Sequence, residues 1–324
     1  MNRSLTKLLL VSAALLLAFC VALGSGEMGW LTPWAMVSDP DGLGLVFWEL
    51  RLPRALLGVI AGASLGVAGA LMQGFFRNPV AEPYVTGVSA GAAFGAVIVL
   101  TLGLGQVWVS LAAFAGAGLT ASLVYRLATR NGVTSPLVLL LGGMALAGFL
   151  QALTMALLLR VDPFGLRSVM VWLMGSLAYR GWDHVGIAAA GLIPGLSIAV
   201  ASSRLLDLLS AGDEPAAFLG VPVQALKRLI IAVACLLAGT AVASCGIIAY
   251  AGLMAPHLAR MLVGARHGLV LPGSAIMGAL LLTTSDLLAR HLIPGQELPV
   301  GVITGVIGAV FLVGLLLTRR RFDS

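Results

Sequence analysis

Long apolar runs separated by short polar segments dominate the chain. Nine of these runs hold the roughly 20 mostly apolar residues that a helix needs to cross the hydrocarbon core of a membrane. They lie near residues 6–25, 55–75, 84–104, 107–127, 135–159, 185–203, 229–249, 269–289 and 300–318. A β-barrel would instead show short segments in which apolar and polar residues alternate. The pattern therefore predicts an all-α polytopic membrane protein.

Two shorter apolar stretches decide the number of crossings. Residues 168–177 are too few to span, whereas 251–264 are marginal and interrupted by Pro256. Basic residues precede the first run and follow the last, and basic residues favour the cytoplasmic side. Both termini therefore belong in the cytoplasm, which requires an even number of crossings. Counting 251–264 as a short, broken crossing gives ten, and it places thirteen of the nineteen basic residues inside.

The first run admits a second interpretation, because Arg3 and Lys7 before it resemble the start of a signal peptide. The apolar residues continue past Cys20 without a good cleavage site. We therefore expect a first transmembrane helix in a multi-pass protein of the cell membrane, the inner membrane where there are two.

Composition narrows the class of protein further. Of the 324 residues, 60% are hydrophobic and 10% are charged, whereas soluble domains have about 45–50% apolar and ~25% charged residues. This excludes a soluble enzyme, a disordered chain and a nucleic-acid-binding protein, despite a net charge of +6. Small residues also recur every four positions, which lets helices approach closely. These stripes are Gly58, Gly62, Gly66, Ala70 and Gly74, then Gly87, Gly91 and Gly95, and finally Gly301 and Gly305.

The motifs that would carry chemistry are missing. The chain has no G-x-x-x-x-G-K-[ST] phosphate loop, no H-E-x-x-H zinc motif and no pair of carboxylates within one predicted span. We therefore expect no catalytic residues, no bound metal and no cofactor. Asp286 is the only acidic residue inside a predicted span, and Arg290 follows it at i+4, which favours an intrahelical ion pair over a proton relay. A partner must then supply the energy for any uphill transport.

The segment 204–228 is the longest predicted cytoplasmic loop. Ser210 to Gly212 break a first helical run, and Asp213 stands at an N-cap position with Glu214 in the first turn. Gly220 and Pro222 end the second run. The result is a predicted helix of about two turns that exposes Phe218 and Leu219. Exposed apolar residues on a short helix favour docking into a partner's groove, and folding back onto the bundle is the alternative.

Three arginines lie on the predicted outer side, where arginine is disfavoured. They are Arg51 and Arg54 before the second span and Arg290 near the end of the ninth. Their side chains either reach toward lipid phosphates or offer bidentate contacts to carboxylates of a partner.

In combination, several motifs resemble the FecCD-type permeases, the membrane subunits of type II ABC importers for iron–siderophores, haem and vitamin B12. The resemblance runs essentially end to end. It rests on RLPR, Q-x-x-x-R-N-P-x-A-x-P, G-V-S-A-G-A, A-P-H-x-x-R, and A-R followed by E-L-P-V-G-V.

The resemblance implies a single transmembrane permease domain over residues 1–324 with the type II ABC importer permease fold. In that fold, helices two to five and seven to ten form an inverted pseudo-repeat. It also implies a homodimer or a pair with a sister permease, two ATPase subunits that bind ATP and magnesium, and a periplasmic or lipid-anchored binding protein. Membrane lipid surrounds the assembly, and nucleic acid has no part in it.

The family's functional residues carry over onto matching positions. Within the loop 204–228, residues 213–221 become the coupling helix, and the residues that face the ATPase are Asp213, Glu214, Ala217, Phe218, Leu219, Gly220 and Val221. Arg51, Arg54 and Arg290 become docking points for the binding protein. The short stretch 168–177 becomes a periplasmic gating helix. Candidate gate and pore residues are Asn78, Val80, Thr134, Ser135, Gln73, Gln151 and Trp172.

The resemblance implies a translocation pore driven by ATP through alternating access, with iron(III)–siderophore as the first choice of cargo. Cobalamin and haem are the alternatives within the family. The alternative from another class is an ion-coupled secondary transporter, in which Asp286 would carry the proton. Gln73, Gln151 and Thr154 are either sparse polar contacts in the pore or interhelical hydrogen-bonding groups.

Overall fold

The computed structural model describes residues 3–25, 40–161 and 163–320, and most of them are helical. The elements in chain order are α1 (Arg3–Gly24), the π-helical η1 (Pro40–Gly44) and η2 (Phe47–Arg51), α3 (Leu52–Phe76), the 3₁₀ turn η3 (Pro83–Thr86), α4 (Val88–Thr101), α5 (Gln106–Ala128), β1 (Thr129–Arg130), β2 (Val133–Thr134), α6 (Pro136–Leu158), α7 (Pro163–Leu173), α8 (Trp182–Ala201), α9 (Ser203–Ser210), α10 (Asp213–Phe218), α11 (Val223–Cys245), α12 (Ala251–Val263), α13 (His267–His291) and α14 (Val300–Arg320).

Each of the ten predicted crossings contains a helix. Within the described ranges, eight helical segments are long and apolar enough to cross a membrane. They contain α1, α3, α5, α6, α8, α11, α13 and α14. The other two predicted crossings are the shorter helices α4 and α12, of 14 and 13 residues.

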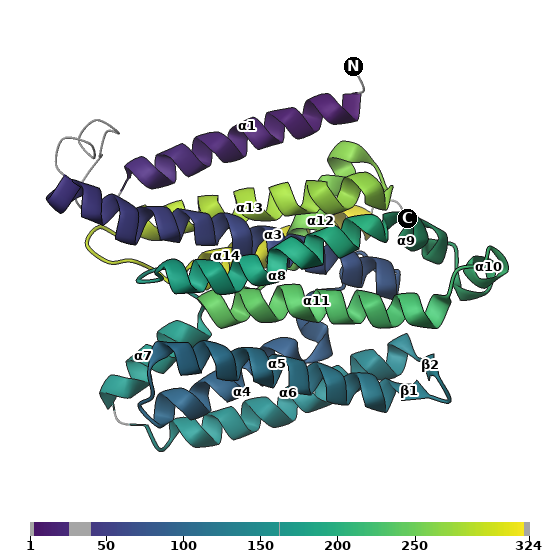
Figure 1. Ribbon diagram of the computed structural model, residues 1–324, viewed down its shortest axis with the longest axis horizontal. Coiled ribbons are helices and arrows are strands. Elements are labelled where there is room, and N and C mark those ends of the chain that lie inside the picture. The colour runs from purple at the N-terminus through teal and green to yellow at the C-terminus, as the bar shows by residue number, and fades with distance from the viewer. Residues whose placement is uncertain (1–2, 26–39, 162, 321–324) are drawn as a thin grey trace.

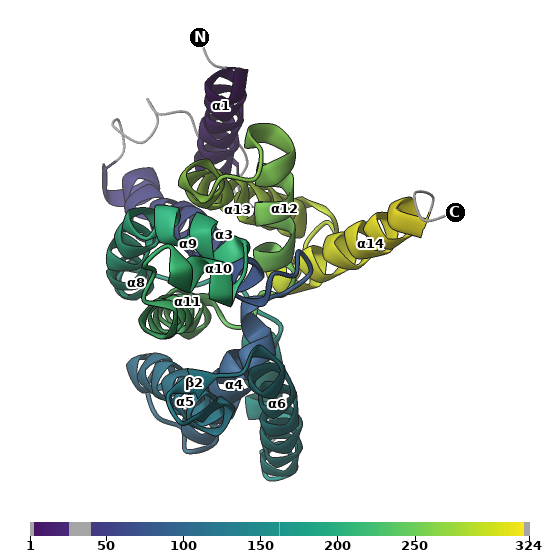
Figure 2. The same ribbon diagram turned by 90° about the vertical axis from the view of Figure 1, so that its right-hand side faces the viewer.

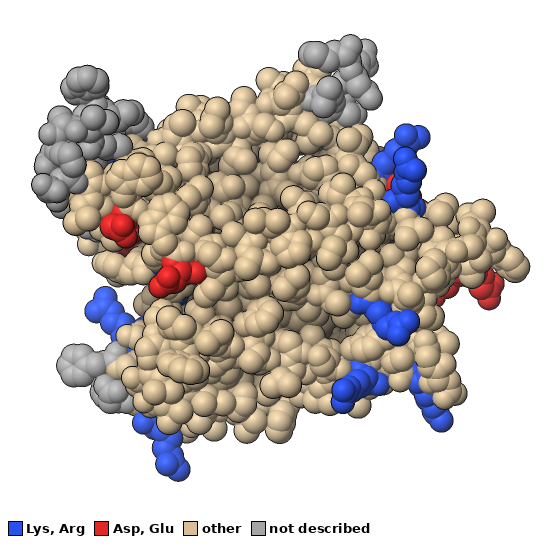
Figure 3. All heavy atoms as spheres, viewed as in Figure 1, with Lys and Arg blue, Asp and Glu red and all other residues tan. Residues whose placement is uncertain are grey.

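The long helices lie roughly side by side and define two ends of the bundle (Figure 1). We call these the α10 end, which also holds α9 and the β1–β2 hairpin, and the α7 end, which also holds η2. The beginning of α1 and the end of α14 both lie at the α10 end (Figures 1 and 2). This agrees with an even number of crossings. Charged side chains on the face in Figure 3 lie toward the two ends, with an uncharged belt between them.

Contacts between helices follow the predicted inverted pseudo-repeat. The central helix α3 packs against α12 and α13, and the central helix α11 packs in the same way against α4 and α5. The two central helices also pack against each other. Because α3 ends at the α10 end and α11 begins there, the two run in opposite directions (Figure 1). Each half also contains one short helix, α4 in the first and α12 in the second.

The predicted glycine stripe on α3 forms its contact with α13. A Cβ added at Gly62 would lie 2.3 Å from the carbonyl oxygen of Gly278, and one added at Gly66 would lie 2.1 Å from that of Ser274. Only glycine permits such a close approach of two backbones, as small-residue stripes in membrane helices predict.

The third predicted span, 84–104, is wrong as a continuous helix. After Arg77 ends α3 with a left-handed backbone (φ 49°), the chain turns back into the bundle, and α4 begins only after Gly87 (φ 79°). Pro83 lies beside Gly252, and so does the carbonyl of Leu65 near the middle of α3. Residues 77–87 therefore re-enter the bundle from the α10 end. Such irregular backbone is tolerated at membrane depth where protein surrounds it.

Two further boundaries differ from the sequence expectation. The short helix predicted over 168–177 runs from Pro163 to Leu173 and ends before Gly175, whose φ is 70°. The expectation of a purely helical chain also missed the antiparallel hairpin β1–β2, in which Thr129 pairs with Thr134. Asn131 and Gly132 both have positive φ, and Asn-Gly is the strongest short signal for such a turn.

Candidate functional site

The predicted two-turn helix is present as α10 and stands at the surface of the α10 end. Phe218 is 92% exposed and Leu219 is 65% exposed. Two apolar side chains held out in this way are unusual for an exposed loop. Ala216 and Val221 point the other way and are buried, so α10 is anchored by its inner residues. Of the predicted coupling residues, Val221 therefore lies inside rather than on the exposed surface.

The sequence placed Asp213 at the N-cap, and that placement is wrong by one residue. Gly212 is the N-cap with φ 127°, and Asp213 is the first residue of α10. The carboxylate of Asp213 does not cap the helix but pairs with two basic side chains. It accepts hydrogen bonds from Arg77, at the end of α3, and from Lys227 of α11, where Nζ lies 2.5 Å from Oδ2. Partial burial acts to raise the pKa of Asp213, but Lys227 and Arg77 outweigh it and hold the pKa below its usual range.

Arg77 and Lys227 differ in their surroundings. Lys227 is 1% exposed, so its ammonium group depends on Asp213 for compensation. Arg77 also donates from Nε to the carbonyl of Leu209 at the end of α9, at 3.2 Å. One carboxylate thus joins α10 to the ends of α3 and α11.

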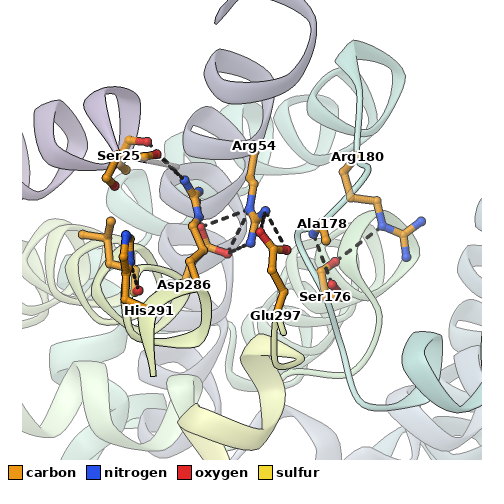
Figure 4. A network of polar contacts seen from close by, with 11 residues as sticks. Ser25, Arg54, Ser176, Ala178, Arg180, Asp286, His291 and Glu297 are labelled. Carbon is orange, nitrogen blue, oxygen red and sulfur yellow. Dashed lines mark hydrogen bonds and ion pairs between the residues drawn. The ribbon is translucent and has the colours of Figure 1, made fainter. Parts of the chain in front are cut away.

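The three predicted outer arginines converge on one cavity of about 210 Å³ at the α7 end. Arg54 reaches two acids at once, with Nη2 2.9 Å from Asp286 Oδ1 and Nη1 3.0 Å from Glu297 Oε1 (Figure 4). Arg290 pairs with the same Asp286, so the predicted intrahelical ion pair is confirmed. Asp286 is 3% exposed and lies between two guanidinium groups.

Arg51 behaves differently from the other two. It is buried, and its Nη1 donates to the carbonyl of Gly24 at 2.6 Å. Arg290 likewise donates to the carbonyl of Ala22, at 3.2 Å. Both arginines therefore hold the end of α1 against the bundle.

Sequence reasoning missed two charged residues of this cavity, Arg180 and Glu297. Arg180 follows Tyr179, which is 96% exposed and has a positive φ. Glu297 stands in the E-L-P-V-G-V motif, which was a usable signal. Its partner Arg54 lies 243 residues earlier in the chain, and no local pattern reveals such a pairing.

The predicted gate segments meet at the α10 end. Asn78 and Val80 line a cavity of about 280 Å³ together with Pro136 at the start of α6. Beside Pro136, Ser135 caps α6 by accepting a hydrogen bond from the Val138 amide. Thr134 is buried, and its amide donates to Gln224 of α11 at 3.1 Å. The segment that holds Asn78 and Val80 thus lies beside the segment that holds Thr134 and Ser135. We call this part of the bundle the gate corner.

The remaining polar candidates divide into buried and exposed groups. Gln73 is buried, donates to the Leu253 carbonyl at 3.2 Å and accepts from Arg260, which matches the interhelical interpretation. The hydroxyl of Thr154 donates to Leu150 within its own helix. Trp172 is buried in α7. Gln151 is exposed on α6, so its amide faces whatever covers that helix.

The re-entrant segment brings a second acid into the bundle, and the expectation that Asp286 would be the only one is wrong. The amide of Tyr250 donates to Glu82 Oε1 at 2.6 Å. Tyr250 is the N-cap of α12 and has a left-handed backbone (φ 64°). Glu82 therefore binds the N-terminus of α12, where a negative charge is favourable.

Among the residues that the structure describes, no group of three or more His, Cys, Asp or Glu side chains could hold a metal ion. The described residues instead form three structural features. An exposed apolar helix lies at one end, a cluster of arginines and acids lies at the other, and interrupted helices lie between them.

Comparison with known proteins agrees with this arrangement. The chain is 37% identical to the hemin transport system permease protein HmuU of Yersinia pestis, with full coverage of both chains. It is 42% identical to the cobalamin import system permease protein BtuC of Halobacterium salinarum, over 87% of this chain and 76% of the relative. It is 40% identical to the Fe(3+) dicitrate transport system permease protein FecD of Escherichia coli, over 96% and 99%.

Solved structures show the same fold. A chain of an ABC transporter assigned to the metal-chelate type, in an inward-facing conformation, superposes with a TM-score of 0.88 at 33% identity, covering 96% of this chain and 98% of that one. PsaBC from Streptococcus pneumoniae shares the fold alone, with a TM-score of 0.60 at 15% identity over 87% and 94%. The model of the FecCD transport family matches residues 10–319, and the chain therefore belongs to that family.

Proposed function

We propose that this chain is the membrane-spanning permease subunit of an ABC importer for a metal chelate. The observation that carries the proposal is α10, a short helix that exposes Phe218 and Leu219 and is fixed to two central helices through Asp213. A separate ATPase subunit binds ATP and magnesium, docks on α10 and drives transport. The relatives named for hemin, cobalamin and ferric dicitrate support the class of cargo.

The proposed orientation places the α10 end, with both chain termini, in the cytoplasm and the α7 end outside. Thirteen of the nineteen lysines and arginines lie on the predicted cytoplasmic side, and they include Arg77, Lys227 and Arg260 at the α10 end. The ATPase then meets Phe218, and a binding protein meets the cavity that Arg54 lines.

A second permease copy, identical or a sister chain, completes the pore beside α6. Gln151 supports this placement, because an exposed amide facing hydrocarbon costs free energy and one facing a polar passage does not. Within the metal chelates, iron(III)–siderophore is our first candidate for the cargo, with cobalamin and haem as alternatives.

The test of ATPase coupling uses the chain coexpressed with its ATPase and reconstituted in liposomes. We expect Phe218→Asp to abolish copurification of the ATPase and ATP-driven uptake of labelled chelate. The matched control is Leu102→Asp, which places a charge on an equally apolar, exposed side chain at the other end. Uptake by the lone permease under a proton gradient would overturn the proposal and favour an ion-coupled transporter.

The cargo is identified by the same uptake assay with iron(III)–siderophore, cobalamin and hemin as competing labelled substrates. Accumulation of the siderophore complex above the other two supports our first candidate. Accumulation of cobalamin or hemin instead replaces that candidate and leaves the permease role intact.

A variant of Glu297 tests whether the binding protein docks at Arg54. This carboxylate already occupies one side of Arg54 and has a side chain that is 26% exposed, so an acidic residue of a binding protein must replace or join it. Glu297→Gln therefore should tighten docking, because it removes the competing charge. Unchanged or weaker docking at low salt would remove Arg54 from the docking surface.

A further inference from the structure

A groove opens on the outside of the helix bundle between α5 and α11. Its volume is about 410 Å³, and its walls include Phe114, Gly118 and Ala121 of α5 and Ala232 and Leu236 of α11. The two helices lie side by side in both ribbon views (Figures 1 and 2). The groove shares no lining residue with α10, with the arginine cavity or with the gate corner.

Small residues explain why the groove exists. The helices come together where Gly239 lies opposite Phe114 and Ala117, since a Cβ at Gly239 would be 3.4 Å from the Phe114 ring. Toward the α10 end they leave space, because a Cβ added at Gly118 would meet nothing within 4 Å. Ala232 is exposed on the opposite wall.

The groove is apolar along most of its length and polar at one end. Arg228 and Tyr125 line it near the α10 end, in the first turns of α11 and the last turn of α5. Arg228 is exposed, and among the residues that the structure describes no hydrogen bond or ion pair engages its guanidinium group. The neighbouring Lys227 differs, since it is buried and paired with Asp213.

The length of the groove matches one leaflet of a bilayer. Phe114 and Tyr125 lie about 16 Å apart along α5 at 1.5 Å per residue. Half of the hydrocarbon core is about 15 Å. The groove thus extends from the level where Arg228 would meet lipid headgroups to about the middle of the membrane.

We propose that this groove binds an anionic phospholipid, with one acyl chain between α5 and α11 and the phosphate at Arg228 and Tyr125. The unpaired guanidinium group at the headgroup level supplies the complementary charge. The proposal does not depend on the direction of transport or on the ATPase.

The test is native mass spectrometry of the full-length chain purified in detergent and titrated with phosphatidylglycerol or phosphatidylcholine. Wild-type protein should retain one phosphatidylglycerol about fivefold more strongly than phosphatidylcholine, the factor expected from one basic residue at a membrane surface. Ala232→Trp fills the groove and should abolish this bound lipid. The control Ala115→Trp places the same ring on an exposed position of α5 outside the groove and should retain it.

Arg228→Gln tests the headgroup contact without altering the groove. It should equalise the two lipids, whereas Arg126→Gln, an exposed arginine of α5 outside the groove, should keep the preference. Equal retention of lipid by wild type and Ala232→Trp would overturn the proposal. So would a loss of dimer in Ala232→Trp with lipid retained, since that would show a second protein copy in the groove.

Discussion

Asp213 and Lys227 form an ion pair in which the ammonium group is buried and the carboxylate is half exposed, with 2.5 Å between Nζ and Oδ2. Asp213→Asn keeps the shape of the side chain but leaves the buried charge of Lys227 without compensation. We expect the free energy of unfolding to fall by about 1–2 kcal/mol, less than for a fully buried pair because solvent reaches the carboxylate. Thermal unfolding in detergent measures this, with Asp183→Asn, an exposed acid at the other end, as the unchanged control.

The same pair predicts a pH dependence. Because the folded-state pKa of Asp213 lies below its ordinary value of 3.8, the carboxylate stabilises the folded state above that value, and this contribution is lost as the pH falls through the lower folded pKa. The stability difference between wild type and Asp213→Asn should therefore stay constant from pH 7 to about 5 and shrink below about pH 4. A difference that shrinks already near pH 6 would contradict this assignment.

Asp286→Asn should be the more damaging change at the α7 end. It leaves Arg54 and Arg290 facing each other with only Glu297 for compensation. Breaking a buried ion pair costs about 3–5 kcal/mol, so we expect poor folding or a large drop in melting temperature. Glu297→Gln, at a more exposed carboxylate, should cost less. A well-folded Asp286→Asn protein that has lost transport would instead point to a proton relay.

Gly62→Val tests the contact between α3 and α13. The new side chain would begin 2.3 Å from the Gly278 carbonyl oxygen, on a backbone that cannot move away easily. Overpacking of this kind typically costs about 1–3 kcal/mol and sometimes more, which thermal unfolding detects. Gly148→Val is the matched control on α6, because a Cβ there meets nothing within 4 Å. Equal melting temperatures for the two variants would show that the helices pack less closely than described.

Two variants of Glu82 distinguish a structural role of this carboxylate from a direct role in transport. Glu82→Gln keeps an oxygen that accepts from the Tyr250 amide and removes the charge. We expect it to retain most ATP-driven uptake, whereas Glu82→Ala should lose the contact and increase hydrogen exchange at the beginning of α12. Complete loss of uptake in a folded Glu82→Gln protein would indicate that the charge itself takes part in transport.

The sequence predicted those features whose causes are local. Helix α10 was found because turn and capping residues flank it, although Gly212 with its positive φ took the N-cap position assigned to Asp213. The pair of Asp286 with Arg290 was found because i and i+4 share a helix face.

Features that depend on distant residues were missed. Arg54 meets Asp286 across 232 positions, and hydropathy cannot distinguish a re-entrant segment such as 77–87 from part of a long span. Glu82 was overlooked for this reason, since its place inside the bundle follows from the left-handed Arg77 and from the contact with Tyr250. The roles of the gate and docking residues stay predictions.

The position of Asp213 also limits how α10 can move. Its two partners belong to opposite halves of the pseudo-repeat, Arg77 at the end of α3 and Lys227 at the beginning of α11. A displacement of α10 would therefore act on both halves through one carboxylate, on α3 through Arg77 and on α11 through Lys227. The position of α10 is therefore tied to the packed pair α3 and α11 as a whole.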